Sequence, residues 1–385
     1  MRFASRTADL IHSPIGAAHA LVPLRTNDRP LLDLSQAAPA FPPAPEVAAR
    51  IAAVAHEPDG ARYAPQPGLP ALRDAFAQDL SDAYEAAIGS QDVLITAGCN
   101  QAFCLVASAL ASPGDSVVLA TPFYFNHDMW LRVEGIEPRH WMPDEDLLPP
   151  VSTLADHVDE TTRAIVIVSP GNPTGVTIPA DRIRAIAAEA RRLGVPLVLD
   201  ETYRTYRGVD GPPHDLFGAP DWGDHVISLH SFSKDLAIPG YRIGAIVGSA
   251  PMLVEALKLL DCVAISAPRV AMEAVITGLT GSGTWRHDQV VRIGALQERF
   301  EAVMSGRPGG FELVSSGAYF GWVRHSFRDV PTQEVVRRLV LDHDVLVIPG
   351  TAFTPGDEHM LRFSFANLTE AELEELPRRL EEMHP

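Results

Sequence analysis

The middle of the chain alternates short apolar runs with segments whose apolar residues recur at helical spacing. The apolar runs lie at residues 93–96, 117–120, 164–169, 197–199, 226–229 and 243–247. Continuous runs of this length are typical of strands that are buried on both faces. Between them, the stretch after Pro70 repeats apolar residues at Leu72, Phe76 and Leu80, as one face of a helix does. This alternation predicts an α/β fold whose mostly parallel sheet is covered by helices on both faces.

Glycine and proline mark where several predicted elements begin and end. Pro179 lies near the first turn of one predicted helix and Gly194 closes it, which is the usual asymmetry of these two residues. Another helix-like run extends from Cys99 to Ala111, directly after the first strand. Polar residues of chemical interest follow several of the strands, at the edge where open α/β sheets bind their ligands.

The pattern changes to longer helices in the last third of the chain. One long helix is predicted from an apolar stripe at Val290, Ile293, Leu296, Phe300 and Val303. Short strands are predicted at 318–323, 345–348 and 360–365, and Thr369 with Glu372 matches the capping box of a final helix.

These patterns divide the chain into two predicted domains. Residues 45–280 form the larger α/β domain, and residues 281–385 form a smaller α+β domain. Residues 1–44 read as an arm with an initial helix, and we expect this arm to join the smaller domain.

Charge and composition exclude several kinds of partner. The net charge is −18, so nucleic acid and anionic lipid surfaces would be repelled. No stretch has about 18 uninterrupted apolar residues, the length that spans a bilayer. The cysteines Cys99, Cys104 and Cys262 are too few and too irregularly spaced for a zinc site or a disulfide framework. We therefore expect a cytoplasmic protein with no metal, no nucleic-acid partner and no membrane partner.

One lysine has an unusual setting. Lys234 lies just past the carboxyl end of the strand at 226–229. Ser231 and Ser233 precede it, and Arg242 follows eight residues later. A turn that gathers one reactive amine and several phosphate-binding donors would suit a phosphorylated aldehyde.

Three further clusters follow strands. Asp200 and Tyr203 come after the strand at 197–199, and Asn172 lies in Asn-Pro-Thr-Gly after the strand at 164–169. The segment Thr96-Ala97-Gly98-Cys99-Asn100 ends the first strand. In this order, and together with Ser-x-Ser-Lys and its arginine, these motifs resemble those of the fold-type I pyridoxal-phosphate-dependent aminotransferases, the class I/II enzymes of the aspartate aminotransferase superfamily. The resemblance covers nearly the whole chain, from about residue 34 to 367.

The resemblance implies a fold and a cofactor. The fold would be type I, with a mostly parallel, seven-stranded type of sheet sandwiched by helices, beside a smaller α+β domain. The cofactor would be pyridoxal 5'-phosphate, whose aldehyde forms an imine with Lys234. Asp200 would pair with the ring nitrogen and keep the ring an electron sink. Tyr203 and Asn172 would bind the ring oxygen, and Tyr124 would stack on the ring.

The resemblance also implies a phosphate site, built from backbone N–H groups at a helix start, two hydroxyls and a guanidinium. Its members would be Gly98, Cys99, Asn100, Ser231, Ser233 and Arg242. Tyr63 would reach the phosphate of the neighbouring subunit, in a homodimer with shared active sites.

The substrate carboxylate would be gripped by Arg362, which follows Pro349-Gly350-x-x-Phe353 as in the family. Asn172 and Ala37 would lie beside it, and Ala37 stands where the family usually has a glycine. Arg269 stands where a glutamine is common, and we expect it at the surface or at the dimer interface.

Each of these residues has a structural alternative. Asp200 could cap a helix or turn, and Asn172 could simply form a tight connection after a strand. Tyr124 could fill a core or an interface, and Arg362 could form an ion pair with an acidic residue. Cys99 could be a thiolate nucleophile at a helix N-terminus, but no histidine lies near it in the sequence to activate it.

These assignments predict a transaminase that works through two half-reactions. An L-amino acid would displace Lys234 from its aldimine, and the freed amine would move a proton from Cα. The nitrogen would then pass to a 2-oxo acid, commonly 2-oxoglutarate in this family. Ile15, Tyr124 and Phe320 could line a pocket that favours aromatic or other large apolar side chains, but the donor and acceptor stay open.

Other functions compete with this one. A carbon–sulfur β-lyase or an aminocyclopropane carboxylate synthase-like enzyme would use the same Lys234, Asp200 and Arg362 with a differently shaped pocket. A regulatory ligand-sensing module would carry a basic winged-helix segment at its N-terminus, where this sequence predicts only a short arm. A nicotinamide-dependent dehydrogenase is disfavoured because no Gly-x-Gly-x-x-Gly follows the first strand.

Overall fold

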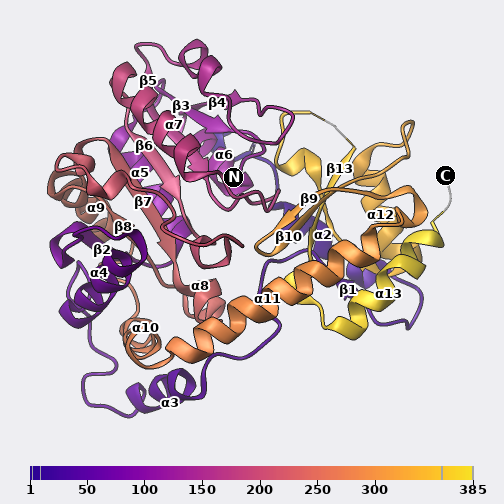
Figure 1. The fold of residues 1–385 in the computed structure, drawn as a ribbon, viewed down its shortest axis with the longest axis horizontal. Coiled ribbons are helices and arrows are strands. Elements are labelled where there is room, and N and C mark those ends of the chain that lie inside the picture. The colour runs from indigo at the N-terminus through magenta and orange to yellow at the C-terminus, as the bar shows by residue number, and fades with distance from the viewer. Residues whose placement is uncertain (2, 9, 357–358, 384–385) are drawn as a thin grey trace.

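A seven-stranded sheet forms the centre of the larger part of the protein, whose computed structural model describes residues 1, 3–8, 10–356 and 359–383 (Figure 1). The strand order is β2-β8-β7-β6-β5-β3-β4, and every pair is parallel except the two that β8 makes. The strands are β2 Val93–Thr96, β3 Ser116–Ala120, β4 Glu137–Trp141, β5 Thr162–Val168, β6 Leu197–Asp200, β7 Val226–Ser231 and β8 Gly244–Val247. The predicted α/β fold with a mostly parallel sheet is confirmed.

Helices pack on both faces of this sheet because its strands are apolar on both sides. On β6, Val198 packs with residues of α5, α6 and α9, whereas Leu197 and Leu199 pack with residues of α7. The helices of this part are α3 Pro45–Val54, α4 Pro70–Tyr84, α5 Cys99–Leu110, α6 Phe125–Glu134, α7 Ala180–Leu193, α8 Phe232–Asp235, α9 Ala250–Val263 and α10 Arg269–Gly281. Pro179 and Gly194 bound α7 as predicted, and Gly194 takes the left-handed conformation with φ 72°.

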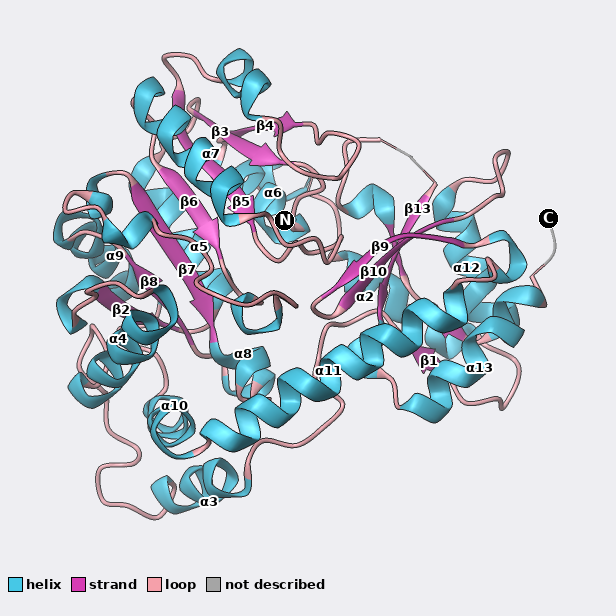
Figure 2. Cartoon of the chain, viewed as in Figure 1, coloured by secondary structure: helices cyan, strands magenta, loops and turns pink. Residues whose placement is uncertain are grey.

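The smaller part is built on an antiparallel sheet ordered β12-β13-β10-β9. Its strands are β9 Glu312–Gly317, β10 Phe320–Arg324, β12 Ile348–Pro349 and β13 Met360–Ser364. The helices α11 Gly283–Met304, α12 Thr332–His343 and α13 Glu370–Glu381 share one apolar core with this sheet. Figure 2 shows α11 running from the neighbourhood of α10 in the larger part to the smaller sheet. The predicted capping box opens α13, because Glu372 Oε2 accepts the Thr369 N–H at 2.8 Å and Thr369 Oγ1 accepts the Glu372 N–H at 3.3 Å.

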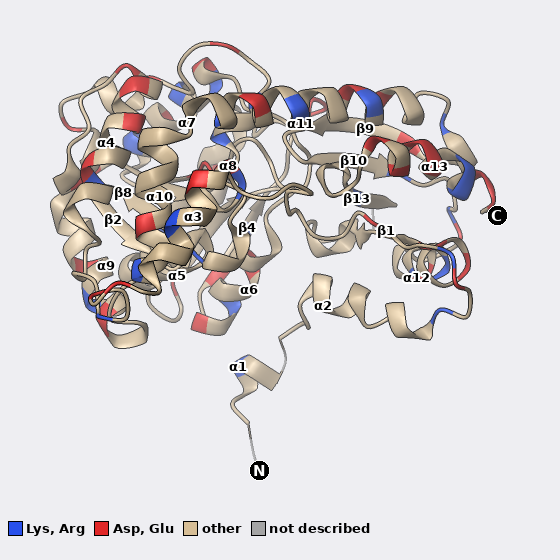
Figure 3. Cartoon of the chain, turned by 90° about the horizontal axis from the view of Figure 1, so that it is seen from below, with Lys and Arg blue, Asp and Glu red and all other residues tan. Residues whose placement is uncertain are grey.

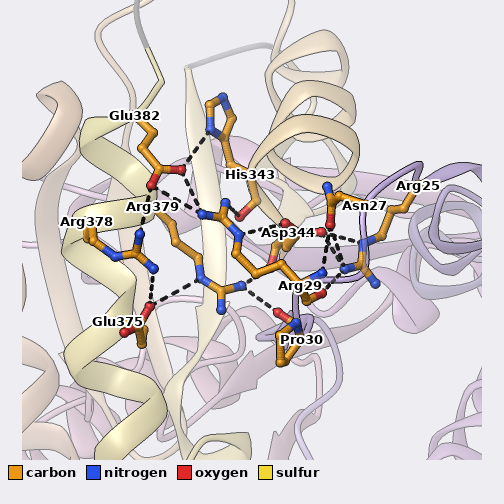
Figure 4. A network of polar contacts seen from close by, with 10 residues as sticks. All are labelled: Arg25, Asn27, Arg29, Pro30, His343, Asp344, Glu375, Arg378, Arg379 and Glu382. Atoms are coloured by element: carbon orange, nitrogen blue, oxygen red, sulfur yellow. Dashed lines mark hydrogen bonds and ion pairs between the residues drawn. The ribbon is translucent and has the colours of Figure 1, made fainter.

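From residue 14 onward the N-terminal arm lies on the smaller part, whereas residues 5–8 contact α6 of the larger part. Its helices α1 Ser5–Ala8 and α2 Pro14–His19 are short, and β1 Leu32–Asp33 pairs in parallel with β11 Val345–Leu346. Between β1 and α2, Arg25 and Arg29 both bind the fully buried carboxylate of Asp344, with Arg29 Nε 2.9 Å from Asp344 Oδ2 (Figure 4). A buried carboxylate is stable only when it is paired, so this contact anchors the arm to the smaller part.

Two strands depart from the apolar pattern. β4 lies at the edge of the large sheet, where one side has no partner strand, and its sequence Glu-Pro-Arg-His-Trp contains no apolar run that would predict it. The run at 318–323, predicted as one strand, is instead the turn and second strand of a hairpin. Ala318 has φ 47° and begins the turn between β9 and β10. The half-buried serines of β9 concealed the first strand of this hairpin.

Charged side chains of both signs are spread over the outer helices of both parts (Figure 3). Within the described residues, no helix combines the length and apolar character needed to cross a membrane. The same residues contain no group of three or more His, Cys, Asp and Glu side chains that could hold a metal ion.

Candidate active site

A cavity of about 360 Å³ lies where the strand ends of the larger part meet the smaller part. β5, β6 and β7 contribute their last residues, Val168, Asp200 and Ser231, and β13 contributes Arg362. Of the residues singled out in the sequence, those that line it are Ile15, Ala37, Cys99, Asn100, Tyr124, Asn172, Asp200, Tyr203, Ser231, Ser233, Lys234, Arg242 and Arg362. The fold thus brings together side chains that are more than 300 positions apart in the sequence, as Ala37 and Arg362 are.

Lys234 lies in α8, the single helical turn that follows β7. Ser231 caps this turn by accepting the Ser233 N–H at 3.2 Å. The Lys234 Nζ donates to the backbone carbonyl of Ala37, and within the described residues it makes no ion pair. Burial, with the positive charges of Arg242 and Arg362, lowers the pKa of Lys234 from 10.5 to about 7. The amine is therefore available in its neutral, nucleophilic form near neutral pH.

Asp200 ends β6 and is held by three donors. Its Oδ1 accepts the Thr202 N–H at 3.0 Å and lies 3.7 Å from Cys99 Sγ, and its Oδ2 lies 3.3 Å from His127 Nε2. Burial alone would raise the pKa of Asp200, but the hydrogen bonds of His127 and Thr202 lower it below the usual value. Asp200 caps no helix, but it does cap the turn that follows β6, because its Oδ1 accepts the Thr202 N–H. It is an ionised carboxylate at the floor of the cavity.

Cys99 is buried at the start of α5, and its thiol is a poor nucleophile there. Burial and the neighbouring Asp200 raise the pKa of the Cys99 thiol well above its usual value. The helix N-terminus therefore does not produce a thiolate in this protein.

His127 is a site residue that the sequence did not reveal. It lies on α6, is 2% exposed, and its ring stacks on Phe103 with the ring centroids 3.9 Å apart. Its edge also faces Tyr124, three residues earlier. A helix drawn from residue 125 would have placed His127 on the same side as Tyr124, but nothing in that segment links it to Asp200, 73 positions further on.

Arg362 is 1% exposed on β13, and its guanidinium faces the cavity. Nη1 donates to Asn172 Oδ1 at 3.0 Å, Nη2 donates to the Ser35 carbonyl, and Nε has no hydrogen-bond partner among the described residues. The rings of Phe320 and Phe353 lie 5.1 and 5.0 Å from the guanidinium carbon. No described carboxylate pairs with Arg362, so the structural ion pair considered above is absent from this part of the chain.

Tyr203 lines the same side of the cavity as Arg362. Its ring is 4% exposed and packs edge-on against Phe320, with centroids 5.1 Å apart. Burial raises the pKa of the Tyr203 hydroxyl well above its usual value, so this group is a hydrogen-bond donor at neutral pH.

An anion cradle is formed by the start of α5 and by Arg242. No side chain caps the backbone N–H groups at the helix start, and Gly98 there has φ 91°. A Cβ placed on Gly98 would lie 2.5 Å from Arg242 Nη2, so only glycine lets the guanidinium approach the helix. Arg242 itself has φ 54°, and its Nη1 donates to the Pro239 carbonyl at 2.9 Å. Free N–H groups beside a guanidinium favour a bound phosphate.

The outer wall of the cavity comes from α6 and the arm. Tyr124 precedes α6, and its hydroxyl accepts from Asn126 Nδ2 at 3.0 Å. Ser13, Ile15 and Gln36 of the arm complete the wall. Ile15 was expected in this pocket, whereas Ser13 and Gln36 carry no motif that would have marked them in the sequence.

Tyr63 does not line the cavity of its own chain. It is 75% exposed on the loop before α4. Arg269 orders this loop, because its guanidinium donates to the carbonyls of Arg62 and Tyr63 at 3.4 and 3.5 Å. The assignment of Tyr63 to a neighbouring subunit stays a prediction.

Comparison with known proteins identifies a family for this chain. Residues 29–380 match the family described as "Aminotransferase class I and II". An aromatic aminotransferase of Arabidopsis thaliana, ISS1, is 30% identical over 359 residues, which cover 91% of this chain and 88% of the relative. An aspartate aminotransferase of Pyrococcus horikoshii is 27% identical, with 82% of this chain and 81% of the relative covered.

A solved structure shares the fold over the full length. The aspartate aminotransferase of Thermus thermophilus with maleate superimposes with a TM-score of 0.89 at 24% identity, covering 99% of this chain and 100% of that one. At this level of identity the likeness shows the arrangement of the elements alone.

Proposed function

This chain belongs to the class I and II aminotransferases, and from that membership we propose that it binds pyridoxal 5'-phosphate at Lys234 and takes its amino group from an L-amino acid with a large apolar side chain. It is an enzyme, and its activity is the transfer of an amino group between an amino acid and a 2-oxo acid. The observation that carries the cofactor assignment is the Lys234 amine, which lines the cavity and has its pKa lowered to about 7.

The residues of the cavity fit pyridoxal phosphate group by group. The phosphate would lie in the cradle of Gly98, the start of α5 and Arg242, which a Cβ at Gly98 would fill. Asp200, kept ionised by its donors, would hold the ring nitrogen protonated. Tyr203 and Asn172 would hydrogen-bond the ring oxygen. When bound, the cofactor supplies an aldehyde that accepts amino groups and a ring that withdraws electrons from Cα.

The protein's own groups perform the proton transfer and the orientation. Arg362 would bind the substrate carboxylate through two parallel hydrogen bonds. The two flanking phenylalanine rings would hold the plane of the guanidinium in a fixed orientation. Lys234 and Arg362 line the same cavity, so a substrate held by its carboxylate would lie in the space that the amine also faces. The neutral Lys234 amine would act as general base toward Cα, and its protonated form would return the proton.

The preference for an apolar donor rests on the charges of the cavity. Lys234, Arg242 and Arg362 are the cationic side chains that line it within the described residues, and each has a role already. A second carboxylate on the substrate would therefore find no further cationic side chain among the described residues that line the cavity. Ile15 and Phe125, by contrast, present apolar surface to the cavity. The 30% identity to an aromatic aminotransferase supports the same choice.

We also propose a homodimer in which Tyr63 serves the partner's site. Its side chain is exposed, yet Arg269 holds the backbone beneath it. Light scattering of the purified enzyme tests the dimer. Mixing the inactive variants Lys234→Ala and Tyr63→Phe tests the sharing, because hybrid dimers would hold one intact site and regain activity.

The experiment for the cofactor is a titration of the apo-protein with pyridoxal phosphate, followed by borohydride reduction and peptide mass analysis. The mass of the cofactor should appear on the peptide of Lys234, and Lys234→Ala should abolish both this addition and turnover. Lys258→Ala, at an exposed position on α9, is the matched control and should change neither. Addition to another peptide in the wild-type protein would refute the assignment.

The experiment for the substrate compares phenylalanine, leucine and aspartate as donors to 2-oxoglutarate, with the amino product and free ammonia measured separately. We expect kcat/KM for phenylalanine to exceed that for aspartate by at least tenfold. A preference for aspartate would refute the substrate class while leaving the cofactor assignment intact. Ammonia without an amino product would indicate β-elimination.

A further inference from the structure

The residues that follow Lys234 and Tyr203 in the sequence belong to one buried network of four charges. Asp235 Oδ2 lies 2.8 Å from Arg286 Nη2, and Arg286 Nη1 lies 2.8 Å from Asp79 Oδ1. Asp79 Oδ2 also binds Arg204. The four side chains come from α8, α11, α4 and the segment after β6. The network therefore joins Asp235 and Arg204, which adjoin Lys234 and Tyr203 in the sequence, to α11, the helix that runs into the smaller part (Figure 2).

The network is mostly buried and electrically neutral. The side chains of Asp235, Arg204, Arg286 and Asp79 are 7%, 11%, 15% and 17% exposed. Burial alone would raise the pKa of Asp79, but the two arginines lower it to about 2, so this carboxylate stays charged at neutral pH. Burying ion pairs costs about as much free energy as their attraction returns, so such a network is weak evidence for stability alone. A role in placing the reactive groups accounts for it better.

The contacts show what the network holds. α8 is one turn long, and its lysine and aspartate are consecutive residues. On one side, Tyr206 Oη donates to the Lys234 carbonyl at 3.1 Å. On the other, the Asp235 carboxylate reaches Arg286, and Asp235 Oδ1 has no partner among the described residues. Through Arg286, α11 thus makes a charged contact with the α8 turn.

We propose that Arg286 is a positioning residue for Lys234, which it acts on by holding the Asp235 carboxylate and cancelling its charge. This inference rests on the function proposed for Lys234. α11 spans both parts of the protein. The contact between Arg286 and Asp235 therefore links the turn that carries Lys234 to the helix that packs in the smaller part, where Arg362 lies. Asp79 and Arg204 complete the balance of charge.

The charge balance makes the proposal testable through pH. The ionisable groups that share the cavity with Lys234 are Cys99, Tyr124, Asp200, Tyr203, Arg242 and Arg362. Around the network lie Tyr84, Glu201, Tyr206, His214, His230 and Tyr319. The charges that act most on the Lys234 amine are those of Arg242 and Arg362. Removing Asp235 or Arg286 would leave the other charge uncompensated at the turn that carries Lys234.

The chain offers an unusually clean probe, because it contains only two lysines, Lys234 and Lys258. In the apo-protein, labelling with acetic anhydride across pH 5–11, read by peptide mass, gives the titration of each amine. Lys258, whose side chain is 64% exposed, is the internal reference. This readout needs neither cofactor nor turnover.

The variants have opposite expected signs. Arg286→Met leaves the Asp235 anion uncompensated, so the Lys234 midpoint should rise by about one pH unit. Asp235→Asn leaves Arg286 in excess, so the midpoint should fall by a similar amount. In the double variant both charges are gone, and the midpoint should return to the wild-type value. Arg299→Met, on the same helix and ion-paired only at the surface with Glu374, is the matched control and should not shift it.

A second readout measures position instead of charge. The rate at which Lys234 forms its imine with pyridoxal phosphate, followed by absorbance, should fall about tenfold in Arg286→Met and in the double variant. Arg286→Lys should recover part of it. If Arg286→Met does not fold, Asp235→Asn and Arg286→Lys carry the test.

Two outcomes overturn the proposal. One is a Lys234 midpoint and an imine rate that are the same in Arg286→Met, Asp235→Asn and Arg299→Met. The other is a shift of the same sign in both single variants, as general loosening would produce. Failure of the proposed function looks different, because in that case wild-type Lys234 itself forms no imine.

Discussion

Replacement of Arg362 by lysine tests the substrate site most directly, because it keeps the charge and removes the fork. Arg362 directs Nη1 and Nη2 to the Asn172 oxygen and the Ser35 carbonyl, which orient its guanidinium toward the cavity. The group lies about equally far from the rings of Phe320 and Phe353, at 5.1 and 5.0 Å. A lysine ammonium cannot make two parallel bonds to a carboxylate and does not stack as a plane.

The expected magnitude follows from these contacts. Loss of one charge-assisted hydrogen bond to the substrate carboxylate costs about 1.5–3 kcal/mol, and loss of the stacked cation about 1 kcal/mol more. The sum of about 2.5–4 kcal/mol corresponds to a fall of roughly 70- to 900-fold in kcat/KM. Because the carboxylate is bound in the ground state as well, most of this fall should appear in KM.

The assay compares phenylalanine with phenethylamine, which lacks the carboxylate. The wild-type enzyme should prefer phenylalanine strongly, and Arg362→Lys should reduce this preference while leaving phenethylamine nearly unaffected. Arg324→Lys is the matched control, since Arg324 lies on the neighbouring strand β10, is half exposed and pairs with Glu312. The reasoning is wrong if Arg362→Lys keeps kcat/KM for phenylalanine within threefold, or if both donors lose activity equally.

Three further substitutions test other parts of the structure. Gly98→Ala places a Cβ 2.5 Å from Arg242 Nη2 at a φ of 91°, so the Kd for pyridoxal phosphate should rise at least tenfold in a fluorescence titration; an unchanged Kd would contradict the cradle. Asp344→Asn leaves the two arm arginines without their buried partner and should lower stability by about 3 kcal/mol in urea unfolding, with a higher KM because the arm lines the cavity. Lys234→Met should stabilise the apo-protein at neutral pH. The pKa of Lys234 falls from 10.5 unfolded to about 7 folded, so its penalty is absent above pH 10.5, grows as pH falls and is complete below about 7. The gain, of the order of a few kcal/mol, should therefore vanish toward pH 10.5, whereas Lys258→Met should show no such pH dependence.

The residues that the sequence identified share one property, which is that each stands beside a strong local signal. Asp200 and Ser231 end apolar strands, and Asn172 lies in a recognisable turn. In a parallel sheet the strand ends meet at one edge, so locating them along the chain was enough to bring them together. Tyr63 also had a local signal, but its role depends on a second subunit and stays a prediction.

The residues that the sequence did not identify depend on contacts between distant elements. His127 approaches Asp200 only because α6 packs on the face of the sheet where β6 ends. Arg286 approaches Asp235 only because α11 begins beside α8. Neither pair has a spacing that could be read along the chain. The apolar pattern of the sequence also failed to predict the edge strand β4, because a strand with one free side needs little apolar character.

The sequence by itself determined the fold class, which polar residues follow each strand, and the amine at position 234. Periodicity and turn residues reveal these features because they act over a few neighbouring positions. Only the tertiary structure decided how those groups behave. A lysine titrates near pH 7 and an aspartate stays ionised because of what surrounds them, and burial and charge are set by residues that the chain brings together from hundreds of positions apart.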